Sequence, residues 1–173
     1  MVVGLIIGRF QPVHKGHVKA ILMILRKVDF LIIGIGSAQK CFFSSNPFTA
    51  GERITMLKAA LDEAGVKGSK YMLIPIQDVY DNRLWVPHVL SLIPRFDIVY
   101  TNDHLSNYLF NTAGVKAELF PEYDRTVYSS TEVRKRIKED GNWQELVPKS
   151  VVKIIDEIKG VERIKFIEAQ SLK

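Results

Sequence analysis

The sequence predicts an α/β fold: a mostly parallel sheet of about five strands, flanked by helices and followed by a helical C-terminal part. Short apolar runs rich in β-branched residues recur through the first 121 residues, and segments with helical periodicity separate them. Strands that alternate with helices form βαβ units with right-handed crossovers, which make the sheet parallel. The chain has 173 residues, a length that suits one domain. We therefore expect a single domain over 1–173, with an α/β core over 1–121 and a helical part over 122–173.

Five segments have the pattern of strands that are buried on both faces. They are short and apolar, and most of them are too short for a helix. The expected strands are Val2–Gly8, Phe30–Gly36, Tyr71–Ile76, Phe96–Thr101 and Lys116–Phe120.

Helices are expected between and after these strands. The first begins near His17, with apolar residues at helical spacing up to Leu25. The second begins at the capping box Thr49–Glu52 and ends before Gly65. The remaining expected helices are Trp85–Ile93, Thr131–Lys138, Asn142–Leu146 and Ser150–Lys159.

The composition excludes several classes of protein. With 47% hydrophobic and 25% charged residues, the chain does not resemble a disordered one. A single cysteine, Cys41, forms neither an internal disulfide nor a zinc cluster, which favours a reducing compartment, the cytoplasm. The apolar, uncharged stretch Phe30–Gln39 is too short to span a bilayer. The apolar start Val2–Gly8 lacks the basic leader of a signal peptide.

The loop after the first expected strand carries a cluster of residues suited to an anion. In an open parallel sheet, ligands bind outside the carboxyl ends of the strands, beside loops that lead into helices. Here Gly8 permits a sharp turn, Arg9 offers a guanidinium fork, and Gly16 leaves room for a phosphate near the backbone. The imidazoles of His14 and His17, neutral or charged near neutral pH, add donors at a helix start whose free N–H groups favour anions.

A second helix start repeats this pattern in Tyr128–Arg134, which reads YSSTEVR. Ser129 and Glu132 have the spacing of a helix cap, and Arg134 follows within the first turns. Two helix N-termini that carry hydroxyl, imidazole and guanidinium donors predict a site for a polyphosphate.

These motifs resemble those of a known family. The stretch GRFQPVHKGH (8–17) is similar to the HxGH signature of the nucleotidylyltransferase superfamily, and YSSTEVR (128–134) to its SSTxxR partner. The resemblance to archaeal-type nicotinamide-nucleotide adenylyltransferases extends over nearly the whole chain, through IGIGSAQ (33–39), NPFTAGER (46–53), NRLW (82–85), FDIVY (96–100) and VPKSVVKIIDEIKGVERI (147–164). It implies a Rossmann-like nucleotidylyltransferase fold and a homo-oligomer, since relatives form hexamers.

The resemblance also implies a reaction. AMP would pass from ATP to nicotinamide mononucleotide (NMN), which gives NAD and pyrophosphate in NAD biosynthesis, and relatives accept the nicotinate form to varying degrees. In phosphoryl transfer the protein mainly positions the substrates and stabilises charge, and the attacking phosphate is already ionised. Mg²⁺ would arrive bound to ATP, so no metal site made by the protein is expected.

The family's motifs assign roles to individual residues. The catalytic residues would be those that contact the ATP phosphates and stabilise the leaving pyrophosphate: His14, His17, Arg9 and Arg134. The residues expected to bind ATP are Gly8, Arg9, Phe10, His14, Gly16, His17, Tyr128, Ser129, Ser130, Thr131 and Arg134. The residues expected to bind NMN are Ser37, Asn82 and Trp85, with the indole stacked on the nicotinamide ring.

The chain departs from the family's pattern at three places. Thr101–His104 (TNDH) follows FDIVY where relatives commonly have Gly-Asn-Pro, so a substrate contact is not carried over there. Ser130 matches the wider superfamily rather than the archaeal YSGTE. Lys40–Ser45 (KCFFSS) lacks the histidine and arginine expected before NPF, so a phosphate contact is missing or comes from elsewhere.

Several of these residues also have ordinary structural explanations. A tryptophan such as Trp85 is more often a core residue than a platform for a ligand. His14 and His17 have a spacing that could ligate a metal, but one cysteine and two further histidines make a zinc set hard to complete. Asp78 and Asp81 could hold a metal, although carboxylates in turns are usually solvated.

The basic run Arg134–Lys138 is the main alternative signal, because on its own it could bind nucleic acid. Val133 and Ile137 give this helix a buried stripe, and nearby acids dilute its charge, so we expect a solvated helix with one functional arginine. The net charge of +5 then suits ATP and a mononucleotide better than nucleic acid or a membrane. Two other functions stay open: a sister nucleotidylyltransferase acting on another phosphate such as phosphopantetheine, and a non-catalytic nucleotide- or RNA-binding module.

Overall fold

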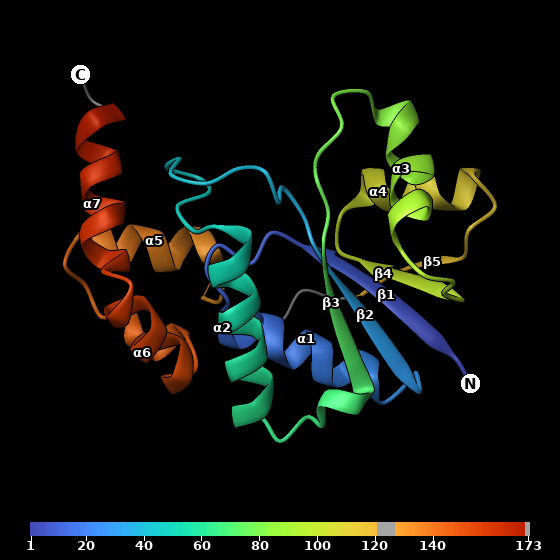
Figure 1. Cartoon of the computed structure of the whole chain (residues 1–173), viewed down its shortest axis with the longest axis horizontal. Coiled ribbons are helices and arrows are strands. Elements are labelled where there is room, and N and C mark those ends of the chain that lie inside the picture. Colours follow the sequence, from blue (N-terminus) through green and yellow to red (C-terminus); the bar gives the residue numbers. More distant parts are fainter. Residues whose placement is uncertain (121–126, 172–173) are drawn as a thin grey trace.

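One five-stranded sheet forms the centre of the computed structural model, which describes residues 1–120 and 127–171 (Figure 1). Every strand runs parallel to its neighbours, in the order β3-β2-β1-β4-β5. The strands are β1 (Val3–Gly8), β2 (Phe30–Ile35), β3 (Tyr71–Pro75), β4 (Ile98–Thr101) and β5 (Ala117–Leu119). The predicted α/β class is confirmed, and each predicted strand end lies within two residues of the observed one.

Helices cover both faces of the sheet, because alternate residues of each strand point to opposite sides. On one face α1 (Lys15–Leu25) and α2 (Ala50–Glu63) pack against strand residues such as Ile6 and Ile33. On the other face α3 (Trp85–Leu92) and α4 (His104–Thr112) pack against Leu5, Ile32 and Val99. This double coverage explains why the strands are apolar throughout rather than alternating.

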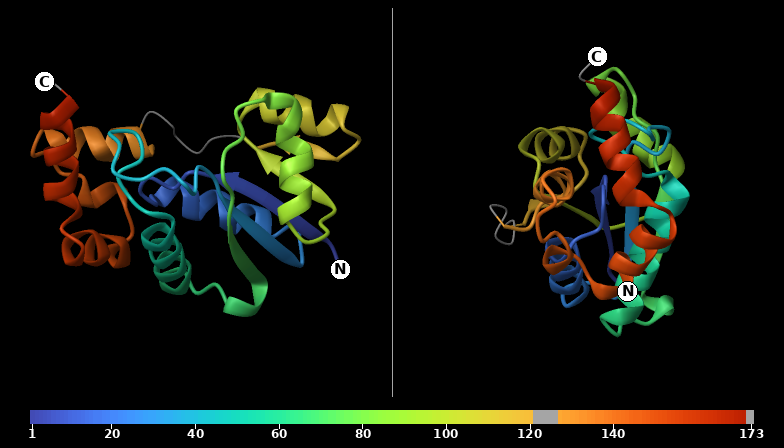
Figure 2. Two further views of the ribbon diagram at one scale, coloured as in Figure 1. Left: turned by 45° about the horizontal axis from the view of Figure 1, so that its top comes forward. Right: turned by 90° about the vertical axis from the view of Figure 1, so that its left-hand side faces the viewer.

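The C-terminal helices extend the first of these cores. They are α5 (Ser130–Lys138), α6 (Lys149–Glu157) and α7 (Gly160–Ser171), and they gather beside α2 at one end of the molecule, with α3 and α4 at the other (Figure 2). Val133, Val151, Ile155 and Ile164 belong to the same buried cluster as the residues of α1 and α2. The boundary predicted after residue 121 lies outside the described residues.

Three helical segments differ from the prediction. Helix α4 was not predicted; it begins where the Asp103 carboxylate accepts from the backbone N–H of Ser106 at 2.7 Å. The segment 142–146 is only a single 3₁₀ turn, Gln144–Leu146, and α7 is a separate helix. The break before α7 falls at Lys159, whose φ of 54° is left-handed, and Gly160, where a Cβ would lie 2.9 Å from the Phe48 ring. No helix in 1–120 or 127–171 is both long and apolar enough to cross a bilayer.

The direction in which the sheet grows reverses between β1 and β4. From β1 the chain adds β2 and β3 on one side, and it then crosses to the other side to add β4 and β5. At such a reversal the loops that leave neighbouring strands diverge, and the crevice between their carboxyl ends is where open α/β sheets bind ligands.

Candidate active site

A cavity of about 270 Å³ opens at this reversal, where the loop after β1 meets the first turns of α1 and α5. Asn102, which follows β4, and Phe120, which follows β5, also line it. Its lining includes every residue that the motifs predict for ATP: Gly8, Arg9, Phe10, His14, Gly16, His17, Tyr128, Ser129, Ser130, Thr131 and Arg134. Two motifs more than a hundred residues apart in the sequence therefore form one hollow.

His14 and His17 cap α1 and hold each other in place. Nδ1 of His14 accepts from the backbone N–H of His17, and Nδ1 of His17 accepts from the backbone N–H of His14, both at 3.3 Å. The two rings stack, with centroids 3.6 Å apart and planes 27° apart. Because Nδ1 is the acceptor in each ring, the proton of each neutral imidazole sits on Nε2. The pair is a capping box in which both rings keep Nε2–H as a donor.

Burial keeps both imidazoles neutral in the ligand-free site at neutral pH. It lowers the pKa of His14 from 6.5 to about 3. Burial also lowers the pKa of His17 well below 6.5, and the neighbouring His14 adds to the effect. The sequence left the charge of the two imidazoles open, and the structure indicates neutral hydrogen-bond donors.

The two glycines of this loop make room for neighbouring side chains. A Cβ on Gly8 would lie 2.9 Å from the Phe10 ring, and one on Gly16 would lie 3.0 Å from both Nδ1 of His14 and Cβ of Tyr128. The left-handed turn falls at Phe10, with a φ of 53°, so the prediction that Gly8 makes the sharp turn is wrong. Gly16 lets the segment before α5 approach α1, a reason that the sequence did not reveal.

The start of α5 forms the opposite wall of the cavity. Ser129 caps the helix with its hydroxyl, as predicted. The Ser130 hydroxyl donates to the Pro12 carbonyl at 2.9 Å, and Nη1 of Arg134 donates to the Gln11 carbonyl at 2.7 Å. These two bonds fasten α5 to the loop after β1 and fix the width of the site between the two helix N-termini.

The cavity is electropositive. Arg9 is exposed at its mouth and Arg134 is buried in its wall, while the described lining contains no carboxylate. Burial, together with the charge of Arg9, lowers the pKa of Arg134, but a guanidinium stays charged in proteins. Two guanidinium groups and two helix N-termini on one hollow favour an anionic ligand.

The rest of the basic run behaves as a solvated helix. Val133 and Ile137 are buried, as predicted. Arg136 pairs with Glu132 at 2.9 Å and also with Glu145, and Lys138 pairs with Glu168 at 2.6 Å. A second, more open hollow adjoins the first through Thr131 and Arg134 and is lined further by Phe43, Ser44, Ser45, Lys135, Lys138 and Glu139. The segment 40–45, which lacks the histidine and arginine of the family's pattern, therefore borders this hollow through its residues 43–45.

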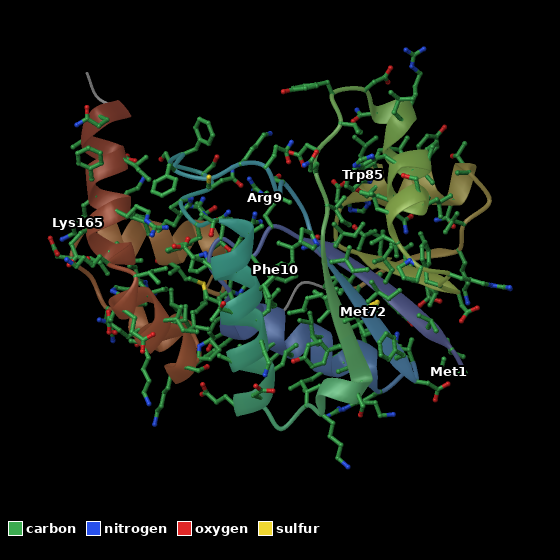
Figure 3. All side chains as sticks on the ribbon, in the orientation of Figure 1. Met1, Arg9, Phe10, Met72, Trp85 and Lys165 are labelled. Atoms are coloured by element: carbon green, nitrogen blue, oxygen red, sulfur yellow. The ribbon has the colours of Figure 1, made fainter. Side chains whose placement is uncertain are left out.

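The three residues predicted for NMN do not line either hollow. Ser37 is buried after β2, and its backbone N–H and hydroxyl both donate to Oδ1 of Asp78, at 3.1 and 3.0 Å. Asn82 is exposed in a 3₁₀ turn, and Trp85 is half-buried as the first residue of α3. Figure 3 shows Trp85 and Arg9 at the same end of the sheet, beyond the carboxyl ends of the strands. The hydroxyl of Ser37 is thus engaged within the protein, while Asn82 and Trp85 keep exposed surface.

The two turn carboxylates are paired with cations. Asp78 pairs with Lys40 at 2.8 Å, and Asp81 with Arg83 at 2.6 Å. Burial acts to raise the pKa of Asp78, but hydrogen bonds from Lys40 and Ser37 bring it below its ordinary value. Within the described residues, no three histidine, cysteine or acidic side chains come together as a metal site.

Sequence reasoning missed one residue beneath the site, Arg53 of α2. Its side chain is fully buried, and its guanidinium donates to four backbone carbonyls. They are those of Thr49 at 3.2 Å, Arg9 at 2.7 Å, Gly36 at 2.7 Å and Ser37 at 3.2 Å. Burial lowers the pKa of Arg53 to about 10, so that it stays charged at neutral pH.

A signal for this residue is present in the sequence. Arg53 lies three, four, seven and eight positions before the other buried residues of α2, which are Met56, Leu57, Ala60 and Leu61. A charged side chain on the buried stripe of an amphipathic helix needs internal partners, and backbone carbonyls at strand ends are suitable ones.

Comparison with known proteins agrees with this geometry. A family model described as cytidylyltransferase-like matches residues 5–136. A nicotinamide-nucleotide adenylyltransferase from Thermococcus sibiricus is 49% identical over 164 residues, which cover 95% of this chain and 88% of that protein. One from Pyrococcus horikoshii is 50% identical over 165 residues, with the same coverage. The chain belongs to the nicotinamide-nucleotide adenylyltransferase family.

A solved structure adds support for the fold expected of a nicotinamide-nucleotide adenylyltransferase. A bifunctional NMN adenylyltransferase/ADP-ribose pyrophosphatase from Francisella tularensis matches 90% of this chain with a TM-score of 0.74 at 20% identity. The chain spans half the length of that protein. The predicted Rossmann-like nucleotidylyltransferase fold is therefore confirmed.

Proposed function

We propose that this protein transfers the adenylyl group of ATP to nicotinamide mononucleotide, forming NAD and pyrophosphate in NAD biosynthesis. The observation that carries the proposal is the electropositive cavity at the carboxyl ends of β1 and β4, which collects both motifs of the family. Relatives that are 49% and 50% identical in sequence over 95% of this chain are named for this activity.

In this proposal the cavity holds the triphosphate of ATP. Nε2–H of His14 and of His17 donate to phosphate oxygens, Arg9 approaches from the mouth, and Arg134 together with the start of α5 faces the β- and γ-phosphates. The adjoining hollow at Thr131 and Arg134 offers further room for the distal phosphates. The remaining ATP contacts are proposed for the residues that line the same cavity: Gly8, Phe10, Gly16, Tyr128, Ser129 and Ser130.

The reaction needs no covalent intermediate on the protein. A phosphate oxygen of the mononucleotide attacks the α-phosphorus in line, and the bond from that phosphorus to the bridging oxygen of pyrophosphate breaks. Holding the two substrates in this arrangement supplies roughly 7–11 kcal/mol. The neutral imidazoles and the guanidinium groups stabilise charge on the phosphorus and on the leaving pyrophosphate. A bound phosphate favours the charged form of a nearby imidazole and so acts against the lowering of both histidine pKa values by burial.

Mg²⁺ enters as part of the ATP complex. The described lining of the cavity offers imidazole, guanidinium, hydroxyl and amide groups but no carboxylate, so it suits phosphate oxygens better than a bare divalent cation. When bound with ATP, the cation would neutralise part of the charge of the triphosphate.

The nicotinamide half of the mononucleotide is placed at the loop after β3. Trp85 and Asn82 retain exposed surface there, and an indole face suits a flat cationic ring. Ser37 contributes by shaping the turn after β2, since its hydroxyl is bonded to Asp78. The pairing of α5 cations with acids supports small anionic partners rather than nucleic acid.

We also propose that the chain acts as a single domain, in a homo-oligomer in the cytoplasm. A buried cluster that continues from the sheet into α5, α6 and α7 supports the single domain. Family resemblance supports the oligomer, which light scattering of the purified protein measures; a monomeric mass contradicts it.

The proposed reaction is tested with purified protein, ATP, Mg²⁺ and a panel of acceptors. The panel contains nicotinamide mononucleotide, nicotinate mononucleotide, phosphopantetheine and glycerol phosphate, and chromatography identifies the products. We expect dinucleotide from the first acceptor. Adenylylation of phosphopantetheine or glycerol phosphate alone favours a sister enzyme, and ATP binding without any product favours a binding module.

A further inference from the structure

We propose that Arg53 is a positioning residue that locks two substrate segments together, the loop after β1 (residues 9–14) and the turn after β2 (residues 36–39). The inference rests on the proposed function, in which the first segment binds ATP and the second borders the NMN site. Arg53 itself touches neither substrate, because its side chain is fully buried beneath both segments.

A single nitrogen of Arg53 bridges the two segments. Nη1 donates to the carbonyl of Arg9 and to the carbonyl of Gly36, each at 2.7 Å, and Nη2 donates to the carbonyl of Ser37 at 3.2 Å. Nε bonds the carbonyl of Thr49, the N-cap residue of α2. The planar fork of the guanidinium therefore fixes three chain segments at distances that a flexible ammonium does not reproduce.

The turn after β2 depends on this fork. Ser37 has a φ of 50°, a left-handed conformation that costs energy for a residue with a Cβ. Asp78 holds its backbone N–H and its hydroxyl from one side, and Arg53 holds its carbonyl from the other. Removal of Arg53 leaves the carbonyl of Ser37 with only the backbone N–H of Lys40, at 3.0 Å, and takes the guanidinium donor away from the carbonyls of Arg9 and Gly36.

The charge of Arg53 also matters for the site. No acidic side chain in the described part of the chain hydrogen-bonds to its guanidinium; the partners that hold it are carbonyl dipoles. An ion buried without a carboxylate carries a desolvation penalty that an apolar residue on the same helix stripe avoids. Its positive charge lies beneath the loop that carries Arg9, and adds to the potential that attracts the triphosphate.

The test compares Arg53→Met, which removes both the fork and the charge, with Arg53→Lys, which keeps the charge alone. Leu57→Ala is the matched control, because Leu57 is equally buried one turn along α2 and belongs to the hydrophobic core. Each variant is assayed below its melting temperature for kcat and for the KM of both substrates. Calorimetry measures the affinity for a non-hydrolysable ATP analogue, with and without NMN.

We expect Arg53→Met to raise both KM values at least several-fold, to lower kcat about tenfold or more, and to reduce the effect of NMN on analogue affinity. Arg53→Lys should recover part of the analogue affinity but not the coupling between the two ligands. Leu57→Ala should lower the melting temperature and leave both KM values within about twofold of the wild type. If Arg53→Met does not fold, Arg53→Lys alone tests the proposal, through the expected loss of the effect of NMN on analogue affinity.

Two results overturn the proposal. In the first, folded Arg53 variants keep both KM values and the coupling of the wild type. In the second, only one substrate is affected, which shows that Arg53 supports one segment without joining the two. A wild-type protein that binds the analogue but forms no dinucleotide contradicts the proposed function instead. In that case the calorimetric comparison of the variants still tests whether the Arg53 guanidinium joins the two segments.

Discussion

Acidification should destabilise the ligand-free protein through the stacked histidines. The pKa of His14 is about 3 in the folded chain and 6.5 when exposed, so between these values the unfolded chain binds a proton that the folded chain does not. Stability is therefore complete above pH 6.5 and is lost as the pH falls, at about 1.4 kcal/mol for each pH unit. At pH 5 the loss from His14 alone is about 2 kcal/mol, which corresponds to roughly 4–8 °C in melting temperature for a chain of this size.

The assay is thermal unfolding between pH 7 and pH 5, a range in which most carboxylates stay ionised. His14→Asn is the matched variant, because asparagine retains a capping oxygen for α1 but does not take up a proton in this range. We expect the wild type to lose clearly more stability than the variant, and we expect saturating ATP to reduce the difference, since phosphates favour the protonated rings. Equal losses in the wild type and in His14→Asn would refute the assignment of buried, neutral imidazoles.

Three substitutions probe the separate parts of the site. His17→Ala should lower kcat by about 100-fold while changing NMN affinity little, because its donor acts mainly in the transition state; steady-state kinetics with NMN titration measure both, and equal losses count against that role. Trp85→Ala should raise the KM for NMN and leave that for ATP nearly unchanged; an unaltered KM for NMN removes the indole from the pocket. Gly16→Ala should raise the KM for ATP several-fold, because the new Cβ lies 3.0 Å from Tyr128 and pushes the segment before α5 away; an unchanged KM shows that the contact relaxes freely.

The sheet was predictable because its strands are buried on both faces and therefore form distinct apolar runs. Helix α4 was not predicted because only Phe110 of its residues is buried, so its periodicity is weak. Its clearest signal in the sequence was Asp103, which caps the helix. That residue lies in the segment Thr101–His104, where the chain differs from the family's pattern. The break between α6 and α7 depends on the packing of Gly160 against Phe48, a contact between distant segments that no local pattern encodes.

The cavity that we propose for ATP could be located from the sequence because its motifs lie directly after β1 and at the start of α5, where parallel topology brings them together. The tautomers of His14 and His17 follow from their mutual capping, which only the folded geometry shows. The role of Arg53 depends on carbonyls from three segments of the chain. For the NMN half, neither described hollow includes Trp85, so its place in the site remains a prediction from the motif.

The central claim is direct attack of the mononucleotide phosphate on the α-phosphorus of ATP in the cavity between α1 and α5. It is tested most directly with ATP that a sulfur substitution makes chiral at the α-phosphorus, followed by determination of the configuration at that phosphorus in the dinucleotide. Direct in-line attack by NMN predicts inverted configuration. Retained configuration, which two successive displacements through an adenylyl-protein would give, or the absence of any dinucleotide, contradicts the claim.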